Sequence, residues 1–211
     1  MIYKQETYDI LPLFSTPVLM VKDLFKGNDK LLKYLPDLDM KKNDHNSISI
    51  DKNLFLNNPM FKDLRDHCSL WVKFYADEIM KIDSKQAQIY LTQSWANSTA
   101  KSEKHHSHHH PNSIISGVYY FNNTDTNIVF LSGADALNKT PLEINRHGYH
   151  LYNGTSYTIK PESGRLLLFP STLHHRVETS KDEILRWSLS FNTFVKGELG
   201  KSDQVTKLWL A

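Results

Sequence analysis

From Gln86 onward the chain is built of short runs that alternate apolar and polar residues, and this pattern limits the fold to a mainly β architecture. Alternation with a period of two is typical of strands that bury one face. Turn-forming residues such as Asn122-Asn123-Thr124-Asp125 separate the runs. The pattern predicts strands over Ala87–Asn97, Ser113–Asn122, Asn127–Ser132, Ser156–Lys160, Arg165–Phe169, His175–Glu178 and Glu183–Phe194.

One long amphipathic segment precedes these strands. Asn58 can cap a helix and Pro59 suits the first helical position, so a helix is predicted from about Pro59 to about Ile82. An apolar face of this kind needs a sheet to cover. We therefore expect a barrel or sandwich with helices packed against one face. The residues at helical spacing on that face are Met60, Leu64, Cys68, Trp71, Tyr75 and Ile79.

The remaining segments carry weaker patterns. No linker rich in Gly, Ser or Pro interrupts the chain, so residues 1–211 are expected to form a single domain. We divide it into an N-terminal arm with supporting helices (1–86), a β core (87–195) and a C-terminal tail without a clear pattern (196–211). Within these parts we predict an edge strand or extended arm over Tyr8–Val21, a short helix over Asn28–Leu35, a polar loop over Lys41–Ile50 and a long irregular segment, a candidate lid, over Gly133–Gly154.

Composition excludes several classes of protein. Lys and Arg number 25 and Asp and Glu 23, a net charge of +2, so no nucleic-acid partner is indicated. Purely apolar stretches such as Leu166–Phe169 are far shorter than a membrane span, which argues against a membrane protein. The single cysteine, Cys68, excludes an internal disulfide framework. We expect a cytoplasmic protein.

The run Glu183–Phe194 can be divided by parity. Its apolar residues point one way, as a core face would, and its polar residues point the other. An arginine in such a strand either lies on a solvated outer face or faces a polar cavity and binds an anion there. The apolar set is Leu185, Trp187, Leu189 and Phe191, and the polar set is Arg186, Ser188, Ser190 and Asn192.

Histidines gather in two short patches. Five of the 11 histidines lie between His105 and His110, and two more are adjacent at His174 and His175. Residues two apart on an extended segment point the same way, so His108 and His110 can share a metal ion, as can His106 and His108. Neutral imidazole is a common ligand for iron, zinc, copper and nickel. The alternative is a solvated histidine-rich loop that binds metals only adventitiously.

Six segments of the chain form an ordered set of motifs. They are Ser94-Trp95, His108-His109-His110-Pro111-Asn112-Ser113, Ser116-Gly117-Val118-Tyr119-Tyr120, Gly164-Arg165-Leu166-Leu167-Leu168-Phe169-Pro170-Ser171, His175 with Val177, and Arg186-Trp187-Ser188-Leu189-Ser190-Phe191-Asn192. Together these segments resemble a small family of iron(II)- and 2-oxoglutarate-dependent oxygenases, whose members occur in bacteria and bacteriophages. The resemblance covers roughly residues 90–194 and implies a double-stranded β-helix, a jelly-roll or cupin-like barrel of two facing sheets.

The resemblance also implies roles for particular residues. His108, His110 and His175 match the family's metal-binding histidines. Arg186 and Ser188 match the pair that holds the far carboxylate of 2-oxoglutarate in related oxygenases, and parity places these two on one face. Asn112, Tyr119 and His106 are further pocket candidates, although Asn112 and Tyr119 also suit structural roles.

One departure from the usual pattern concerns the third iron ligand. Most such enzymes use two histidines and one carboxylate, the latter two positions after the first histidine. Here that position is His110, and no Asp or Glu lies in the patch. We therefore expect three histidine ligands with His106 as a spare candidate, unless a distant carboxylate such as Glu103 or Asp125 completes the site.

The resemblance implies an Fe(II)- and 2-oxoglutarate-dependent dioxygenase, most simply a hydroxylase that uses O2 and releases succinate and CO2. Its substrate cannot be deduced from the residues, and a homodimer is one expected assembly. Two alternatives remain open at this point. One is a three-histidine barrel metalloenzyme, a dioxygenase or isomerase that works without 2-oxoglutarate, and the other is a non-catalytic module that binds a metal or small molecule.

Overall fold

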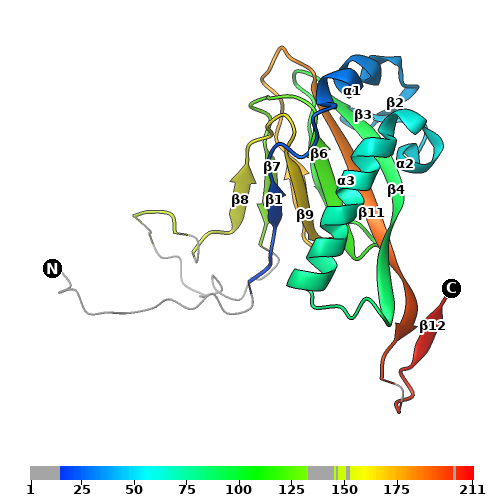
Figure 1. Cartoon of the computed structure of the whole chain (residues 1–211). Coiled ribbons are helices and arrows are strands. Elements are labelled where there is room, and N and C mark those ends of the chain that lie inside the picture. The colour runs from blue at the N-terminus through cyan, green and yellow to red at the C-terminus, as the bar shows by residue number, and fades with distance from the viewer. Residues whose placement is uncertain (1–14, 133–144, 146, 151–152, 202) are drawn as a thin grey trace.

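The protein folds into two β-sheets with helices on the outer face of the larger one (Figure 1). The computed structural model describes residues 15–132, 145, 147–150, 153–201 and 203–211. The large sheet has the strand order β1-β9-β6-β11-β4-β3-β2, with β12 paired to β11, and the small sheet has the order β5-β10-β7-β8. The strands are β1 (Leu19–Val21), β2 (Met40–Asn43), β3 (Asn46–Ser49), β4 (Ala87–Thr99), β5 (His105–His108), β6 (Ile115–Tyr120), β7 (Ile128–Leu131), β8 (Ser156–Ile159), β9 (Leu166–Pro170), β10 (His175–Val177), β11 (Arg186–Leu199) and β12 (Leu208–Leu210).

The helices cover one face of the large sheet. They are α1 (Asn28–Tyr34), α2 (Leu54–Asn57) and α3 (Lys62–Phe74), with 3-10 turns at Leu35–Asp37 and Pro59–Phe61 and a π-helical turn at Tyr75–Ile79. The predicted long helix is thus present as three consecutive pieces. The Asn58 side chain accepts a hydrogen bond from the Met60 amide, as a helix cap does. In Figure 1, α3 lies along the large sheet, and Leu64, Cys68 and Val72 are buried against it.

Two cores lie on the two sides of the large sheet. The first, between sheet and helices, includes Leu189 and Phe191 of β11 and Tyr119 of β6. The second lies between the sheets, where Val118 and Phe169 of the large sheet meet Phe130 of the small one. The division of β11 by parity is therefore confirmed, except that Leu185 precedes the strand and is exposed. Side chains of the opposite parity face the space between the sheets.

The predicted loop over Lys41–Ile50 is wrong. It forms the hairpin β2–β3, which extends the edge of the large sheet through pairing of Ser47 with Ser98. The hairpin turns at Asp44, whose φ of 43° lies in the left-handed region. β2 is the edge strand, where polar side chains are common because little covers them, whereas the polar side chains of Asn46 and Ser49 in β3 are buried. Both strands are therefore polar, and the hairpin has the composition of a loop.

The β structure also extends beyond the boundaries expected for the core. β11 continues to Leu199, and β12 in the expected tail pairs with it. β1, the described end of the expected N-terminal arm, pairs with β9 at the sheet edge. Most of the candidate lid over Gly133–Gly154 lies outside the described residues.

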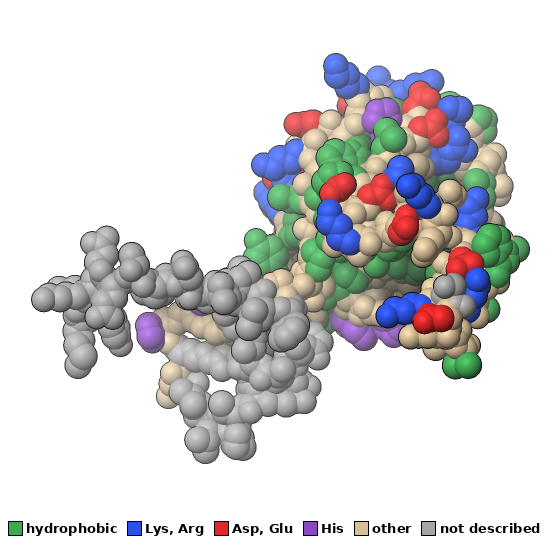
Figure 2. All heavy atoms as spheres, turned by 60° about the horizontal axis from the view of Figure 1, so that its bottom comes forward, with side chains coloured by type: hydrophobic (Ala, Val, Ile, Leu, Met, Phe, Trp, Pro, Cys, Tyr) green, Lys and Arg blue, Asp and Glu red, His purple; other side chains and the backbone are tan. Residues whose placement is uncertain are grey.

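Charged side chains of both signs lie on the surface. On the face shown in Figure 2, Lys and Arg side chains are interspersed with Asp and Glu rather than gathered by sign. Within the described residues, no helix has the length and apolar character needed to cross a bilayer.

Candidate metal centre

Three histidines from two strands and one loop meet between the sheets. β5 and β10 are antiparallel neighbours, and His175 stands directly opposite His108 in their register. His110 follows β5, and its backbone amide donates to the Ser171 carbonyl, 2.9 Å away, which fixes the loop beside β9. Residues far apart in sequence are thus held side by side by backbone pairing.

The imidazoles of His108, His110 and His175 are close enough to bind one ion. One nitrogen from each ring lies within 4.8 Å of the other two, and the Nε2 atoms of His108 and His110 are 3.3 Å apart. The ring centroids are separated by 4.4 to 5.2 Å. Three imidazoles this close together can hold a divalent transition metal.

Hydrogen bonds hold each ring with its Nε2 toward the centre. His108 Nδ1 donates to the His106 carbonyl and His175 Nδ1 donates to the Leu173 carbonyl, both at 2.9 Å. A carbonyl can only accept, so these Nδ1 atoms carry the protons and Nε2 keeps a free lone pair. Carbonyl or carboxylate partners of this kind commonly orient metal-binding histidines.

His110 is held by side chains instead. Its Nδ1 lies 2.8 Å from both Ser116 Oγ and Asn192 Oδ1. Ser116 also bonds to Asn192 and Ser171, so a buried polar network supports this ring. Because Asn192 lies on β11 and Ser116 on β6, the large sheet positions the third imidazole.

Burial keeps all three rings uncharged. Desolvation lowers the pKa of His110 to about 4 and that of His175 to about 3, and it also lowers the pKa of His108. The rings are therefore neutral at physiological pH, the form that binds a metal. The donor set fits Fe(II) as well as zinc or nickel.

A β-bulge brings a fourth histidine toward this centre. The register pairs His175 with His108 and Val177 with His105, so two residues of β5 stand opposite one residue of β10. His105 consequently points to the same side as His108, with ring centroids 4.3 Å apart, and it lines the cavity. The strict alternation expected from the sequence favoured His106, which is exposed and lines neither cavity at the centre.

Arg186 lies in the same cavity without a counter-charge. It is 2% exposed and lies over the Tyr120 ring, with its guanidinium carbon 5.0 Å from the ring centroid. Nη1 donates to Ser188 Oγ at 3.4 Å, whereas Nε has no hydrogen-bond partner. Within the described chain no carboxylate pairs with it. An unpaired buried guanidinium is costly, so an anion is expected beside it.

Two adjoining cavities surround the histidines. The inner cavity, about 40 Å³ in volume, is lined by the three histidines, Arg186 and Ser188, among others. The outer one, about 310 Å³, is lined in addition by Ile48, Lys52 and Gln93. Five residues line both cavities, namely Trp95, Asn97, His105, His108 and His110. The centre is thus reachable from the side of β3 and β4.

The other candidates lie elsewhere. Tyr119 faces the helices, and its hydroxyl donates to Asn28 Oδ1 at 2.8 Å, while its neighbour Tyr120 faces the cavity side. Asn112 is exposed in a turn with a φ of 57°. Glu103 bonds to Lys42 and the Ala100 amide, and Asp125 pairs with Lys160, so neither joins the cluster.

Sequence reasoning missed several cavity residues, among them His105, Asn97 and Thr99. His105 was hidden by the bulge. Asn97 ends the predicted strand Ala87–Asn97, to which no cavity face was assigned, and Thr99 lies beyond it. Asn192 was placed on the correct face of β11, but its bond to His110 was not foreseen. A signal existed for Asn97, because burying polar residues on a central strand is unusual unless a cavity lies beside them.

A protein-family model matches the region of the chain that holds this centre. Residues 93–192 match the family model described as "Putative 2OG-Fe(II) oxygenase". The matched segment runs from β4 to β11 and contains His108, His110, His175, Arg186 and Ser188. No curated protein is similar enough to the chain to count as a relative.

Solved structures of low sequence identity share the fold. HygX from Streptomyces hygroscopicus, solved with nickel, 2-oxoglutarate and hygromycin B, has a TM-score of 0.61 at 16% identity, covering 92% of both chains. The epimerase SnoN, solved with Fe3+, alpha ketoglutarate and nogalamycin RO, has a TM-score of 0.63 at 10% identity, covering 93% of this chain and 90% of its own. A 2OG-Fe(II) oxygenase family oxidoreductase from Burkholderia pseudomallei has a TM-score of 0.58 at 12% identity and 84% coverage of each chain. The expected double-stranded β-helix is therefore confirmed.

Proposed function

We propose that this Fe(II)- and 2-oxoglutarate-dependent oxygenase binds its iron through His108, His110 and His175, and that it hydroxylates its substrate. One observation carries the proposal. Three neutral imidazoles with free Nε2 lone pairs share a cavity with a buried guanidinium that has no counter-ion among the described residues. A metal and a dicarboxylate together satisfy both features.

Arg186 and Ser188 are proposed to hold the far carboxylate of 2-oxoglutarate. A guanidinium fork binds a carboxylate in a bidentate manner, and Ser188 Oγ lies on the same face of β11 to donate a further bond. The inner cavity near them has room for about three water molecules, comparable with one carboxylate group. The rest of the molecule would extend past the histidines.

The charges of the site support an anionic co-substrate. Three neutral ligands leave the full 2+ charge on the ion, and Arg186 adds another positive charge. No ligand carboxylate offsets them in the described chain. A dianion such as 2-oxoglutarate should therefore bind more tightly than it would to a site with two histidines and one carboxylate.

The chain's own residues would position and enclose the reactants. When bound, iron would supply the oxidation in which O2 and 2-oxoglutarate become succinate and CO2 while one oxygen atom reaches the substrate. The backbone carbonyls of His106 and Leu173 hold two ligand rings, and Asn192 with Ser116 holds the third. Apolar side chains of the intersheet core, including Phe169 and Val118, exclude water from one side.

The outer cavity is the proposed entrance for the substrate. It reaches the rings of His105, His108 and His110 from the open side of β3 and β4. Trp95 and Ile48 offer apolar surface there, and Gln93 and Asn97 offer hydrogen bonds.

A coupled turnover assay tests the proposal. The protein is reconstituted anaerobically with Fe(II) and 2-oxoglutarate, O2 is admitted, and succinate is measured. We expect slow succinate release without added substrate, and none when Fe(II) or 2-oxoglutarate is omitted. If the folded protein binds Fe(II) but neither binds 2-oxoglutarate nor forms succinate, the proposal is wrong and a three-histidine metalloenzyme of another type is favoured.

A further inference from the structure

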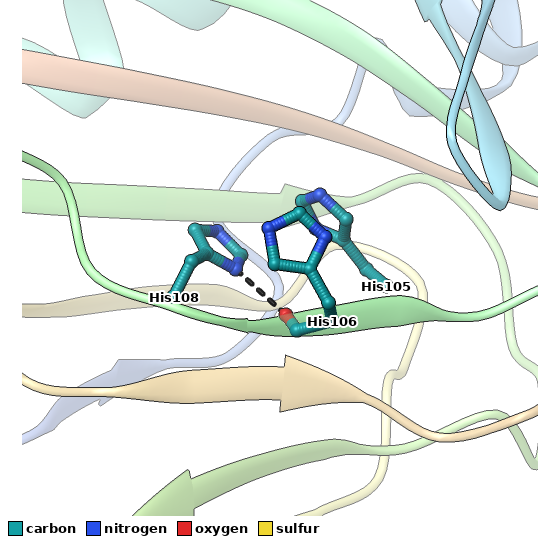
Figure 3. A group of neighbouring side chains, drawn as sticks. All are labelled: His105, His106 and His108. Atoms are coloured by element: carbon teal, nitrogen blue, oxygen red, sulfur yellow. Dashed lines mark hydrogen bonds between the residues drawn. The ribbon is translucent and has the colours of Figure 1, made fainter.

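A second group of histidines lies beside the iron centre and is not explained by the proposed reaction. Figure 3 shows His105, His106 and His108, all from β5, with their rings gathered on one side of the strand. One nitrogen from each ring lies within 4.8 Å of the other two. Because His108 also belongs to the inner group with His110 and His175, we call His105, His106 and His108 the outer triad.

The β-bulge explains why consecutive residues of one strand converge. In a regular strand His105 and His106 would point to opposite faces. Because β5 has an extra residue, the ring centroids of His105 and His106 lie only 4.9 Å apart. The centroid of the His108 ring lies 4.3 Å from that of His105 and 5.5 Å from that of His106. The backbone irregularity therefore produces a cluster of imidazoles that alternation alone would separate.

The donors of the outer triad are available for a ligand. Within the described residues no hydrogen bond occupies the ring nitrogens of His105. His106 is exposed, and its Nδ1 lies 3.7 Å from Asp44 Oδ2, so a carboxylate stands next to the triad. Three imidazoles and a nearby carboxylate form a donor set suited to zinc, cobalt or nickel.

We propose that the outer triad is a second site for a divalent transition metal, and that it shares His108 with the inner group. Filling the outer site withdraws one ligand from the inner centre, so the two sites compete for a single imidazole. The outer triad is closer to solvent, because His106 is exposed and His105 half-buried, whereas His110 and His175 are buried. An ion arriving from solvent meets the outer triad first.

The inner ligands are removed to test the outer site alone. The double variant His110→Ala, His175→Ala is titrated with Co2+, and binding is followed by equilibrium dialysis and by the visible absorption of the bound ion. We expect one Co2+ per chain. Adding His105→Ala and His106→Ala should weaken binding at least tenfold and remove the absorption bands.

A matched control uses the other histidine pair of the same region. His109 and His174 stack with ring centroids 4.8 Å apart and belong to neither group of three. Replacing both by alanine in the double variant should leave Co2+ binding unchanged. Absence of Co2+ binding in the folded double variant, or binding that depends on His109 and His174 instead, would overturn the proposal and indicate adventitious binding to the histidine-rich surface.

The folding of the double variant is checked by near-ultraviolet circular dichroism. If it does not fold, the double variant His110→Gln, His175→Gln replaces it, because a glutamine amide at position 175 can still donate to the Leu173 carbonyl that His175 Nδ1 now contacts. The sharing of His108 is tested in the unaltered chain. One equivalent of Co2+ should saturate tight binding there, and two equally tight equivalents would contradict the sharing.

Discussion

At the scale of single residues, Arg186 shows most clearly how the site depends on an absent partner. It is buried at the start of β11, and the described chain supplies no carboxylate for it. A buried charge without a partner lowers stability, and a ligand that supplies the missing negative charge would offset this cost.

The first prediction concerns Arg186→Ala. We expect 2-oxoglutarate to bind roughly 30-fold more weakly or worse, since truncating one partner of a buried charge pair costs about 2 kcal/mol or more. Metal binding should persist, because the three histidines are unchanged. Calorimetry with Ni2+ and 2-oxoglutarate measures both, and the exposed Arg176 on β10 provides the control variant Arg176→Ala. Loss of metal with intact 2-oxoglutarate affinity would refute the assigned role.

The second prediction concerns His175→Ala. Because His175 is the proposed ligand on β10, we expect stoichiometric Fe(II) binding at the inner centre, and with it succinate formation, to be lost. The adjacent His174 is exposed, so His174→Ala should keep both. Succinate formation decides the matter, because the outer triad is intact in this variant and still offers a site for an ion. A His175→Ala protein that forms succinate at the normal rate would exclude this residue as a ligand.

At the scale of elements, the close packing of β6 against β11 depends on a glycine. Gly117 pairs with Phe191, and a side chain at position 117 would overlap the Phe191 ring. The same two strands carry Ser116 and Asn192, which hold His110. The glycine thus links the packing of the helix-side core to the position of a metal ligand.

The third prediction is that Gly117→Ala destabilises the protein by about 1–3 kcal/mol through overpacking. The smaller ring-free side chain in Phe191→Leu should relieve the overlap, so the double variant should be more stable than the two separate losses predict. Urea unfolding of the four proteins measures the coupling. Strictly additive losses would show that the contact with Phe191 is not the cause.

At the scale of the whole molecule, the two sheets contribute different parts of the site. The small sheet supplies His108 and His175, and the large sheet supplies Arg186, Ser188 and the support of His110. A metal ion and 2-oxoglutarate bound together would therefore connect the sheets across the space between them. A homodimer and a cytoplasmic location remain predictions from the sequence.

The fourth prediction follows from this arrangement. Ligands that bind only the folded state raise its stability by about 2.7 kcal/mol at 100 times their Kd, which corresponds to roughly 5–10 °C in Tm for a chain of this length. Ni2+ alone should raise Tm, and adding 2-oxoglutarate should raise it further. In Arg186→Ala the rise in Tm caused by Ni2+ should be unchanged, and the further rise caused by 2-oxoglutarate should be smaller. Equal increments from 2-oxoglutarate with and without Arg186 would argue against the anchoring role.

The sequence by itself determined which side chains share a face within a regular strand, because backbone geometry alternates them whatever surrounds the strand. Arg186 with Ser188 and the core face of β11 follow from that rule. In the histidine patch the rule allowed two pairs, His106 with His108 and His108 with His110, and the family resemblance favoured the second pair and added His175. Only the tertiary structure decided that His105 rather than His106 lines the cavity, that Tyr119 faces the helices, and that β2 and β3 pair. Each of these depends on a bulge, on which sheet face is covered, or on pairing between edge strands, and such contacts join residues that local alternation cannot relate.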